Sequence, residues 1–340
     1  MKKTLVSIII PNYNGKHFLE KCLKSLREQT FSDFEIILID NGSSDGSIGF
    51  IKNHFSEVKI IANKKNTGFA KACNQGIKLA VGKYIILLNN DTMVDKKWIK
   101  SLVLTAEHDS SIGMCASKIL SEKNVLLVDS VGVNICFNGM SRGRGRLEQD
   151  RWQHNKTEEI LLPSGCAALY RKEMLDEIGF FDESFFAYCE DTDLGLRGQL
   201  AGWKAVLVSD AIVYHYYSGT AGSYSPLKAF LVERNHVLVV LKNFPIWLIL
   251  LFPFFTFWRY LLQFYGILVR RGSSNEFVQS FSFWRLPLIV FKAYFSILTK
   301  LPKILIQRRK IKKQQKISNK KFYLLLKKYH LSIKELVLKS

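Results

Sequence analysis

The sequence predicts an α/β fold, with a mostly parallel sheet flanked by helices and a C-terminal helical segment. Three observations support this prediction. Short β-branched runs alternate with helix-like stretches through the first half of the chain, as in parallel sheets with crossover helices. Of the 340 residues, 48% are hydrophobic, which is enough for a sizeable core. Near residue 240 the composition changes to long apolar stretches and a basic tail, so we expect domains at 1–240 and 241–340.

The expected strands are short runs rich in apolar and β-branched residues, and the continuous apolar run at 35–39 suits burial on both faces of a sheet. These runs occupy residues 6–10, 35–39, 58–61, 84–88, 112–116, 161–170, 205–208 and 212–214. Between them apolar residues recur at helical spacing, as at Phe18, Leu19, Cys22 and Leu26. We therefore expect helices at residues 16–28, 47–55, 69–80 and 191–201. The Gly- and Arg-rich segment 117–158 is expected to form a loop or lid.

The six cysteines are widely spaced and include no C-x-x-C pair. This spacing argues against a zinc knuckle or a disulfide framework and favours buried thiols in a reducing compartment. The first apolar run, Leu5 to Ile10, stops at Pro11 and is too short for the core of a signal peptide. We therefore expect the protein to remain in the cytosol.

Two apolar stretches precede the C-terminal tail. Phe244 to Val269 holds one charge, Arg259, in 26 residues, and a bilayer span needs about 20 apolar residues. Leu286 to Ile306 carries three lysines and is amphipathic. A single span would place the basic tail outside, against the tendency of positive charge to stay cytosolic. An in-plane or partly inserted helical pair over residues 244–306 agrees better with the sequence.

The net charge of +20 is concentrated at the C-terminus, where residues 301–340 carry 13 Lys and Arg against one acid. Because these cations follow apolar stretches, we expect them to contact an anionic membrane surface. The alternative is a buried pair of hydrophobic helices in a soluble protein. The expected location is the cytoplasmic face of a membrane.

Polar loops follow three of the predicted strands. The sequences are PNYNG at residues 11–15, DNGSSDG at 40–46 and NNDT at 89–92. Each loop alone is compatible with an ordinary turn, since Asn, Asp, Gly and Ser favour turns. Ligands of α/β sheets bind beyond the carboxyl ends of the strands, so three such loops at successive strand ends indicate one binding site.

These strings also resemble family 2 glycosyltransferases of GT-A fold. The resemblance rests on SIIIPNYNG (7–15), IDNGSSDGS (39–47), NTGFAKACNQG (66–76), LLNNDT (87–92) and FFAYCEDTDL (185–194). It covers residues 4–240 in the family's order and is strongest to the rhamnosyltransferase-like branch. It implies a Rossmann-like GT-A sheet that binds a nucleotide-sugar donor.

The resemblance implies a role for Asp40 in holding the base or ribose of the donor. Further donor-binding residues are expected on the same loops and at the start of the helix at 69–80. They are Pro11, Asn12, Tyr13, Asn41, Asp45, Asn66, Gly68 and Asn90.

Asp91 matches the metal-binding carboxylate of the family's D-x-D motif, and His215 resembles a family histidine near the metal. The implied cofactor is Mg²⁺ or Mn²⁺, a hard cation that bridges carboxylate and diphosphate oxygens. This sequence has Asn89 and Asn90 where many relatives carry another acid. A lone histidine after a strand is also compatible with a structural role.

Glu190 and Asp191 resemble the family's E-D motif, which supplies the catalytic base. We expect Asp191 to be the base, with Glu190 the second candidate, since inverting transfer needs one carboxylate to deprotonate the acceptor. The alternative is that acids in a first helical turn only favour the helix dipole. We assign Asp193 a structural role and Arg197 to an ion pair or an exposed helix face.

Gly165 and Cys166 lie in a segment that resembles the family's acceptor-side strand, where small residues let a sugar approach the backbone. A glycine-interrupted buried strand is the alternative. The arginines at 142–146 are compatible with closure on the diphosphate and with a solvated loop.

The sequence thus predicts an inverting hexosyl- or deoxyhexosyltransferase acting on a glycan, lipid-linked in our interpretation, in cell-surface polysaccharide synthesis. The alternative is a non-catalytic sugar- or nucleotide-binding scaffold of the same fold. A nucleic-acid binder is disfavoured because no RNP-like or helix-turn-helix pattern is visible. A dinucleotide-dependent oxidoreductase is disfavoured because no G-x-G-x-x-G follows the first strand.

Overall fold

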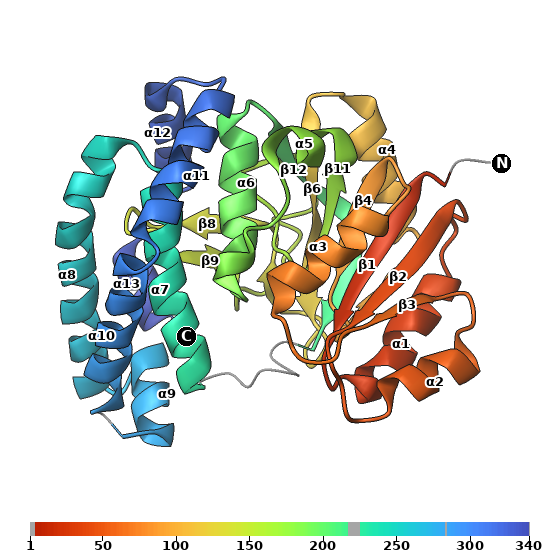
Figure 1. Cartoon of the computed structure of the whole chain (residues 1–340), viewed down its shortest axis with the longest axis horizontal. Coiled ribbons are helices and arrows are strands. Elements are labelled where there is room, and N and C mark those ends of the chain that lie inside the picture. Colours follow the sequence, from red (N-terminus) through yellow and green to blue (C-terminus); the bar gives the residue numbers. More distant parts are fainter. Residues whose placement is uncertain (1–3, 217–224, 283, 340) are drawn as a thin grey trace. The chain divides into compact units, whose positions relative to one another are not determined.

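The computed structural model describes residues 4–216, 225–282 and 284–339 (Figure 1). The chain forms two compact units: a first unit of residues 1–133 and 143–220, and a second unit of residues 134–142 and 221–340. The expected boundary at residue 240 lies inside a helix, α7 (Pro226–Asn243).

A ten-stranded sheet with the order β10-β12-β6-β11-β4-β1-β2-β3 forms the centre of the first unit, with β5 on β12 and β7 on β6. The strands of the described chain are β1 (Val6–Asn12), β2 (Phe34–Asp40), β3 (Lys59–Ala62), β4 (Tyr84–Leu88), β5 (Thr92–Val94), β6 (Ile112–Ser121), β7 (Val128–Ser130), β8 (Val133–Ile135), β9 (Ser141–Gly143), β10 (Glu158–Ile160), β11 (Ala167–Arg171) and β12 (Lys204–His215). Strands β8 and β9 form a separate two-stranded sheet.

The sheet is mostly parallel, which confirms the predicted fold class. Strands β1, β2, β3 and β4 are parallel neighbours, and β12 is parallel to β6. Strand β11 is antiparallel to both β4 and β6, and it joins the two parallel parts into one sheet. The carboxyl ends of β1, β2 and β4 therefore meet at one edge of the first unit.

The prediction that residues 117–158 form a loop is wrong in part. Strand β6 continues to Ser121, and β7, β8 and β9 follow within this segment. The strand continues because its buried polar residues find partners: Trp98 Nε1 donates to Ser117 Oγ at 2.8 Å, and Lys118 Nζ pairs with Asp150 at 2.7 Å. The two strands expected at 205–208 and 212–214 are one strand, β12, with a register shift between Val208 and Ile212. Residues 161–166 lie outside the strand that was expected at 161–170.

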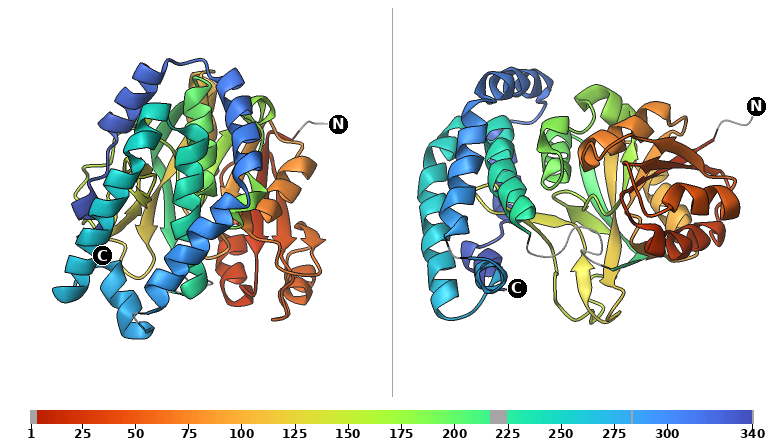
Figure 2. Two further views of the ribbon diagram at one scale, coloured as in Figure 1. Left: turned by 60° about the vertical axis from the view of Figure 1, so that its left-hand side comes forward. Right: turned by 60° about the horizontal axis from the view of Figure 1, so that its bottom comes forward.

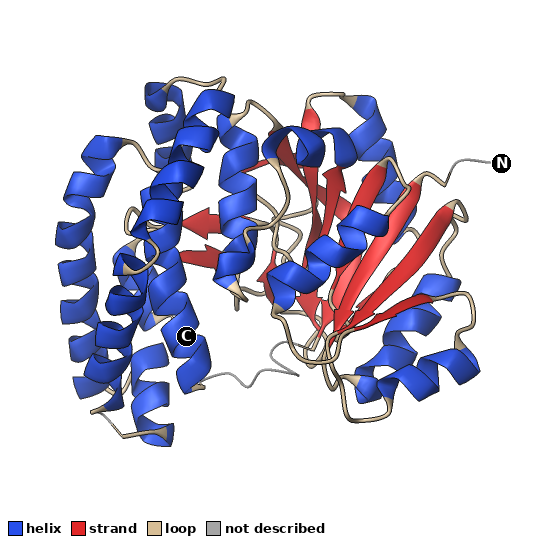
Figure 3. Ribbon diagram, viewed as in Figure 1, coloured by secondary structure: helices blue, strands red, loops and turns tan. Residues whose placement is uncertain are grey.

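Helices cover both faces of the sheet, as Figure 3 shows for the first unit. These helices are α1 (Lys16–Arg27), α2 (Ser47–His54), α3 (Phe69–Leu79), α4 (Trp98–His108), α5 (Lys172–Ile178) and α6 (Glu190–Leu200), with a short 3₁₀ helix, η1 (Glu183–Phe185). Alternate residues of β1 separate the two cores. Ile8 packs with α1, α2 and α4, whereas Ile9 packs with α3, α5 and α6, as the two-residue period of a strand requires.

The second unit is helical, as the two further views in Figure 2 show. Its helices are α7 (Pro226–Asn243), α8 (Ile246–Leu268), α9 (Ser273–Ser280), α10 (Arg285–Leu298), α11 (Leu301–Gln314), α12 (Asn319–Lys328) and α13 (Ile333–Leu338). Among the described residues, α8 is the one unbroken helix that is long and apolar enough to cross a membrane. The second apolar stretch is divided between α10 and α11, because Pro302 starts a new helix there.

Candidate active site

The ends of β1, β2 and β4 are joined by buried side-chain hydrogen bonds. Asn12 Nδ2 donates to Asp40 Oδ2 at 3.0 Å, and Asn90 Nδ2 donates to Asn12 Oδ1 at 2.7 Å. A side chain at position 15 would disturb this pair, since a Cβ on Gly15 would lie 2.7 Å from Asn12 Oδ1. The structure thus brings together three of the predicted donor-binding residues from separate parts of the chain.

The loop after β2 is organised by its two aspartates. Asp40 Oδ1 accepts from Ser43 N at 2.9 Å. Asp45 accepts from Lys16 N at 2.8 Å and from Ser47 N at 3.0 Å, at the first residues of α1 and α2. Burial raises the pKa of Asp45, but the hydrogen bonds from Ser47 and Lys16 outweigh it and hold the pKa below its ordinary value. Asp45 therefore anchors the loop to two helices.

Asn41 connects this loop to the segment before α3. Its Nδ2 donates to Asn66 Oδ1 at 2.9 Å and to Gly68 O at 3.2 Å, while Thr67 N donates to its Oδ1 at 3.0 Å. Asn41 is buried, whereas Asn66 and Tyr13 are exposed. Pro11 lies at the end of β1. The predicted donor-binding residues thus lie along one edge of the sheet, where some of their side chains are buried and others are exposed to solvent.

Asp91 and His215 face each other beside this edge. His215 Nε2 lies 3.3 Å from Asp91 Oδ1, and both side chains are buried. The opposite ring nitrogen, Nδ1, lies 2.7 Å from Asp129 Oδ2. Asp129 Oδ1 accepts in turn from Arg146 at 2.9 Å. Asp129 is not among the residues predicted from the sequence, because nothing in its local pattern distinguishes it.

The surroundings of the His215 imidazole have opposite effects on its pKa. Burial alone would lower its pKa, but Cys166 and the hydrogen bonds to Asp129 and Asp91 hold the pKa well above its ordinary value. The Cys166 thiol lies beside the ring, so this predicted acceptor residue is next to the predicted metal ligands.

The ligand atoms of Asp91 and His215 fit a divalent ion that is also coordinated by a diphosphate. One carboxylate oxygen and one imidazole nitrogen face each other, and no group of three or more His, Cys, Asp and Glu could hold a metal in the described part of the chain. Mg²⁺ is commonly held by one or two carboxylates together with substrate phosphates and water. Asp91 and His215 are therefore suited to an ion that arrives with a nucleotide.

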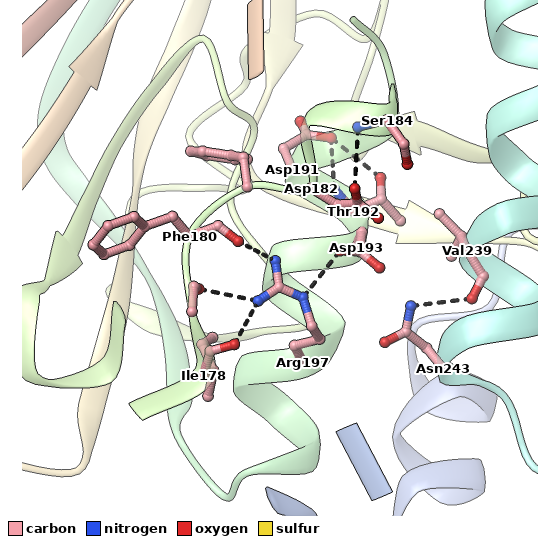
Figure 4. Close-up of polar contacts among 12 residues, drawn as sticks. Ile178, Phe180, Asp182, Ser184, Asp191, Thr192, Asp193, Arg197, Val239 and Asn243 are labelled. Atoms are coloured by element: carbon pink, nitrogen blue, oxygen red, sulfur yellow. Dashed lines mark hydrogen bonds and ion pairs between the residues drawn. The ribbon is translucent and has the colours of Figure 1, made fainter. Parts of the chain in front are cut away.

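Asp191 stands at the start of α6 and is half-buried (Figure 4). Its Oδ2 accepts from Gly165 N at 2.9 Å, and its Oδ1 accepts from Thr192 N at 2.6 Å. Burial raises the pKa of Asp191, although these hydrogen bonds oppose the shift. The carboxylate is thus held in one orientation while its proton affinity is increased, as a general base requires.

Glu190 has different surroundings. It is buried, and its Oε2 has no hydrogen-bond partner among the described residues. Burial, and secondly the charge of Asp191, raise the pKa of Glu190 to about 8. A carboxyl that is buried and protonated at neutral pH is poorly placed to take a proton, so the geometry favours Asp191.

The segment before α6 has an unusual backbone. Phe186, Tyr188 and Cys189 have φ angles of 66°, 67° and 63°, a left-handed conformation that is costly for side-chain-bearing residues. Phe186 O accepts from Ala70 N at 3.1 Å at the start of α3. A strained segment therefore connects the predicted donor-binding loops to the predicted catalytic base.

Asp193 and Arg197 form a buried ion pair within α6, which confirms the ion pair expected for Arg197. Arg197 Nε donates to Asp193 at 2.9 Å, and its other nitrogens donate to the carbonyls of Ile178, Gly179 and Phe180 (Figure 4). Arg144 pairs with Glu158 at 2.6 Å, so it and Arg146 are held by carboxylates of the first unit.

Similar proteins include named and uncharacterised glycosyltransferases. The chain is 28% identical to glycosyltransferase GlyG of Streptococcus pneumoniae, over 64% of this chain and 72% of that protein. It is 39% identical to the uncharacterised glycosyltransferase EpsJ of Bacillus subtilis, over 56% of this chain and 55% of that protein. It is 26% identical to the N-acetylglucosaminyl-diphospho-decaprenol L-rhamnosyltransferase of Mycobacterium tuberculosis, over 64% of this chain and 78% of that protein.

Solved structures share the fold at low identity. GalNAc-T7 with UDP, GalNAc and Mn²⁺ aligns with a TM-score of 0.57 and 19% identity, over 71% of this chain and 48% of that one. The mannosyltransferase PcManGT of Pyrobaculum calidifontis, in complex with GDP-Man and Mn²⁺, aligns at 0.50 and 13%, over 91% and 85%. Residues 7–179 match the family described as glycosyl transferase family 2. That match covers half of the chain, from β1 through α5, and the chain therefore belongs to glycosyl transferase family 2.

Proposed function

We propose that this glycosyltransferase moves a hexosyl or deoxyhexosyl group from a nucleotide-sugar to a glycan hydroxyl, with inversion at the anomeric carbon. The observation that supports this proposal best is a connected set of polar contacts in the first unit. Asn12 is hydrogen-bonded to both Asp40 and Asn90, and Asp91 follows Asn90 directly in the chain. The contacts continue from Asp91 to His215, and Gly165 connects the adjoining Cys166 to Asp191.

In the proposed reaction the nucleotide lies over the ends of β1 and β2, with Asp40 toward its base or ribose. Asp191 takes the proton of the acceptor hydroxyl as its oxygen attacks the anomeric carbon. The bond from that carbon to the diphosphate breaks in the same displacement, so one base suffices. Asp91 and His215 would hold Mg²⁺ or Mn²⁺, which neutralises charge on the departing nucleoside diphosphate.

The reaction is tested by a donor screen on the full-length protein. Release of nucleoside diphosphate from UDP-, GDP- and dTDP-sugars is measured with acceptor glycans, with and without Mn²⁺ or Mg²⁺. We expect metal-stimulated release from one donor and loss of that stimulation in Asp91→Ala. Donor binding without release, across an acceptor set that includes lipid-linked glycans, would instead support the non-catalytic scaffold.

For the acceptor, we propose a lipid-linked glycan in cell-surface polysaccharide synthesis. Support comes from the M. tuberculosis relative, whose name specifies a diphospho-decaprenol acceptor and rhamnosyl transfer. The apolar second unit also supports it, because a lipid-linked acceptor is found at a membrane.

We propose that the outer face of α8 contacts the membrane at its cytoplasmic side. Leu250, Phe257 and Phe264 are seven residues apart and are 74%, 59% and 54% exposed. Large exposed apolar surfaces indicate interaction sites. The single charge of α8 does not interrupt this surface, because Arg259 is 1% exposed and pairs with Glu233 of α7 at 2.6 Å.

Basic residues of the second unit support an anionic membrane as the partner. Exposed cations are present on α10, α11 and α12: Lys292, Lys303, Arg309, Lys310, Lys313, Lys320, Lys321, Lys327 and Lys328. Each cation near an anionic surface contributes about 1 kcal/mol of attraction. Together with the apolar side chains of α8, they suit a helix that lies in the interface or is partly inserted.

Flotation with phosphatidylglycerol-containing vesicles tests this surface. The triple variant L250E/F257E/F264E is expected to lose at least tenfold in vesicle binding. The matched control is L79E/L104E, which places glutamates at exposed leucines of α3 and α4, 57% and 61% exposed, and should bind as the wild type does. Undiminished flotation of the triple variant would contradict the assignment of α8.

A further inference from the structure

His215 is held between two carboxylates that contact opposite nitrogens of its ring. Asp91 lies 3.3 Å from Nε2, and Asp129 lies 2.7 Å from Nδ1. Asp129 is 11% exposed, and it is 86 residues distant from His215 in the chain. A histidine that binds a metal ion gives up one ring proton to do so, and a carboxylate that accepts from Nδ1–H keeps the remaining hydrogen on Nδ1 and directs the Nε2 lone pair to the ion.

We propose that Asp129 is a positioning residue that orients His215 so that Nε2, with its lone pair, faces the divalent cation and diphosphate of the donor. The inference rests on the proposed function, in which Asp91 and His215 hold that cation. A histidine ligand commonly donates its other ring N–H to a carboxylate, which sets the tautomer and the direction of the ring.

Arg146 fixes which oxygen of Asp129 faces the ring of His215. It donates to Asp129 Oδ1 at 2.9 Å, so the two carboxylate oxygens have separate partners, a guanidinium and an imidazole. An asparagine at 129 has only one oxygen for these two donors. If Arg146 keeps that oxygen, the amide NH₂ faces Nδ1 and forces the ring hydrogen onto Nε2. Nε2 is then unable to bind a metal.

The test is Mn²⁺ binding by the full-length protein, followed by the EPR signal of free Mn²⁺, alone and with the nucleoside diphosphate that the donor screen identifies. We expect Asp129→Asn to weaken Mn²⁺ binding by about 10–100-fold. Glu158→Gln is the matched control, since it also removes a carboxylate paired with an arginine, Arg144, and it should leave the affinity unchanged.

Two further variants separate orientation of the ring from simple loss of negative charge. In a His215→Gln background, Asp129→Asn should change the affinity less than twofold. Removing the arginine in D129N/R146M frees the asparagine oxygen to accept from Nδ1–H, so part of the affinity should return.

Several outcomes would overturn the inference. An unchanged affinity in Asp129→Asn would remove the role of Asp129 while leaving the proposed metal use intact. An equal loss with and without His215 would show that Asp129 acts through its charge. Absence of Mn²⁺ binding in the wild type, with or without nucleotide, would refute the proposed metal use itself and the inference with it.

Discussion

At the scale of single residues, the two neighbouring acids of α6 have opposite surroundings. Asp191 is half-buried and accepts hydrogen bonds from two backbone amides, whereas Glu190 is buried with an oxygen that has no partner among the described residues. Adjacent residues of a helix point in directions about 100° apart, so one carboxyl faces the candidate site while the other enters the core.

Asp191→Asn is expected to lower the rate of transfer by at least about 100-fold, the contribution of a positioned general base. Donor binding should survive, because the asparagine is isosteric with aspartate and can still accept a hydrogen bond from Gly165 N. The measurement is turnover together with donor affinity by calorimetry. Asp182→Asn, at a carboxylate that accepts from Ser184 N, should keep the wild-type rate. Near-normal turnover in Asp191→Asn would exclude Asp191 as the base.

Glu190→Gln is expected to change how stability depends on pH. The pKa of Glu190 is about 8 in the folded protein and 4.5 for an unperturbed glutamate. Between these values the unfolded chain has released a proton that the folded chain still holds, so stability falls as pH rises through this window. The glutamine variant has no titrating group at position 190 and therefore lacks this loss of stability. Its melting temperature, relative to the wild type, should rise by several degrees between pH 5 and pH 8. A difference that does not change with pH would contradict the burial of Glu190.

At the scale of elements, the start of α3 packs against the strained segment before α6. Gly68 has φ +90°, and a Cβ there would lie 2.6 Å from Phe186 Cδ2 and 2.7 Å from its carbonyl oxygen. Only glycine combines this backbone with so close an approach. The contact brings the loops predicted to bind the donor close to the helix that carries Asp191.

Gly68→Ala should therefore destabilise the protein by more than about 1 kcal/mol, since both the backbone and the contact with Phe186 are incompatible with a methyl group. Gly49→Ala is the matched control. Position 49 lies in α2, where an added Cβ would have nothing within 4 Å. Replacing glycine by alanine in a helix is expected to raise the free energy of unfolding by about 0.5–1 kcal/mol. Thermal unfolding of both variants checks the prediction, and equal stability of the two would refute it.

At the scale of the whole molecule, the charge is unequally distributed along the chain. Residues 301–340 supply +12 of the net +20, and they follow the exposed apolar face of α8. In the proposed membrane contact the two features would act through different forces, because charge attraction is screened by salt and apolar burial is not.

Raising the salt concentration should therefore weaken binding to anionic vesicles only in part. Between 0.05 and 0.5 M NaCl we expect the affinity for phosphatidylglycerol-containing vesicles to fall at least tenfold and residual binding to persist. Binding to neutral phosphatidylcholine vesicles should hardly change. Complete release at high salt would indicate that α8 stays out of the bilayer, and salt-independent binding would indicate that the basic residues do not contribute.

Much of the fold and the candidate site was predictable from the sequence, because the relevant signals are local. The strands β1 to β4 are continuous apolar runs, and the polar loops follow them directly, so residues such as Asp40 and Asp91 were found at the strand ends. The segment 117–158, expected as a loop, lacks such a local signal. Polar Lys118 interrupts the apolar pattern of β6, and only its partner Asp150 explains why the strand continues.

The fold class, the family and the residues at the strand ends follow from the amino-acid sequence, since they depend on short patterns and their order. The contacts of each side chain follow only from the folded chain. In the folded chain Asp129 contacts His215, Glu190 is buried in the core, and Arg259 pairs with Glu233, which lies 26 positions away in the sequence. The physical reason is that burial and hydrogen-bond partners come from residues distant in sequence, and no local pattern records them.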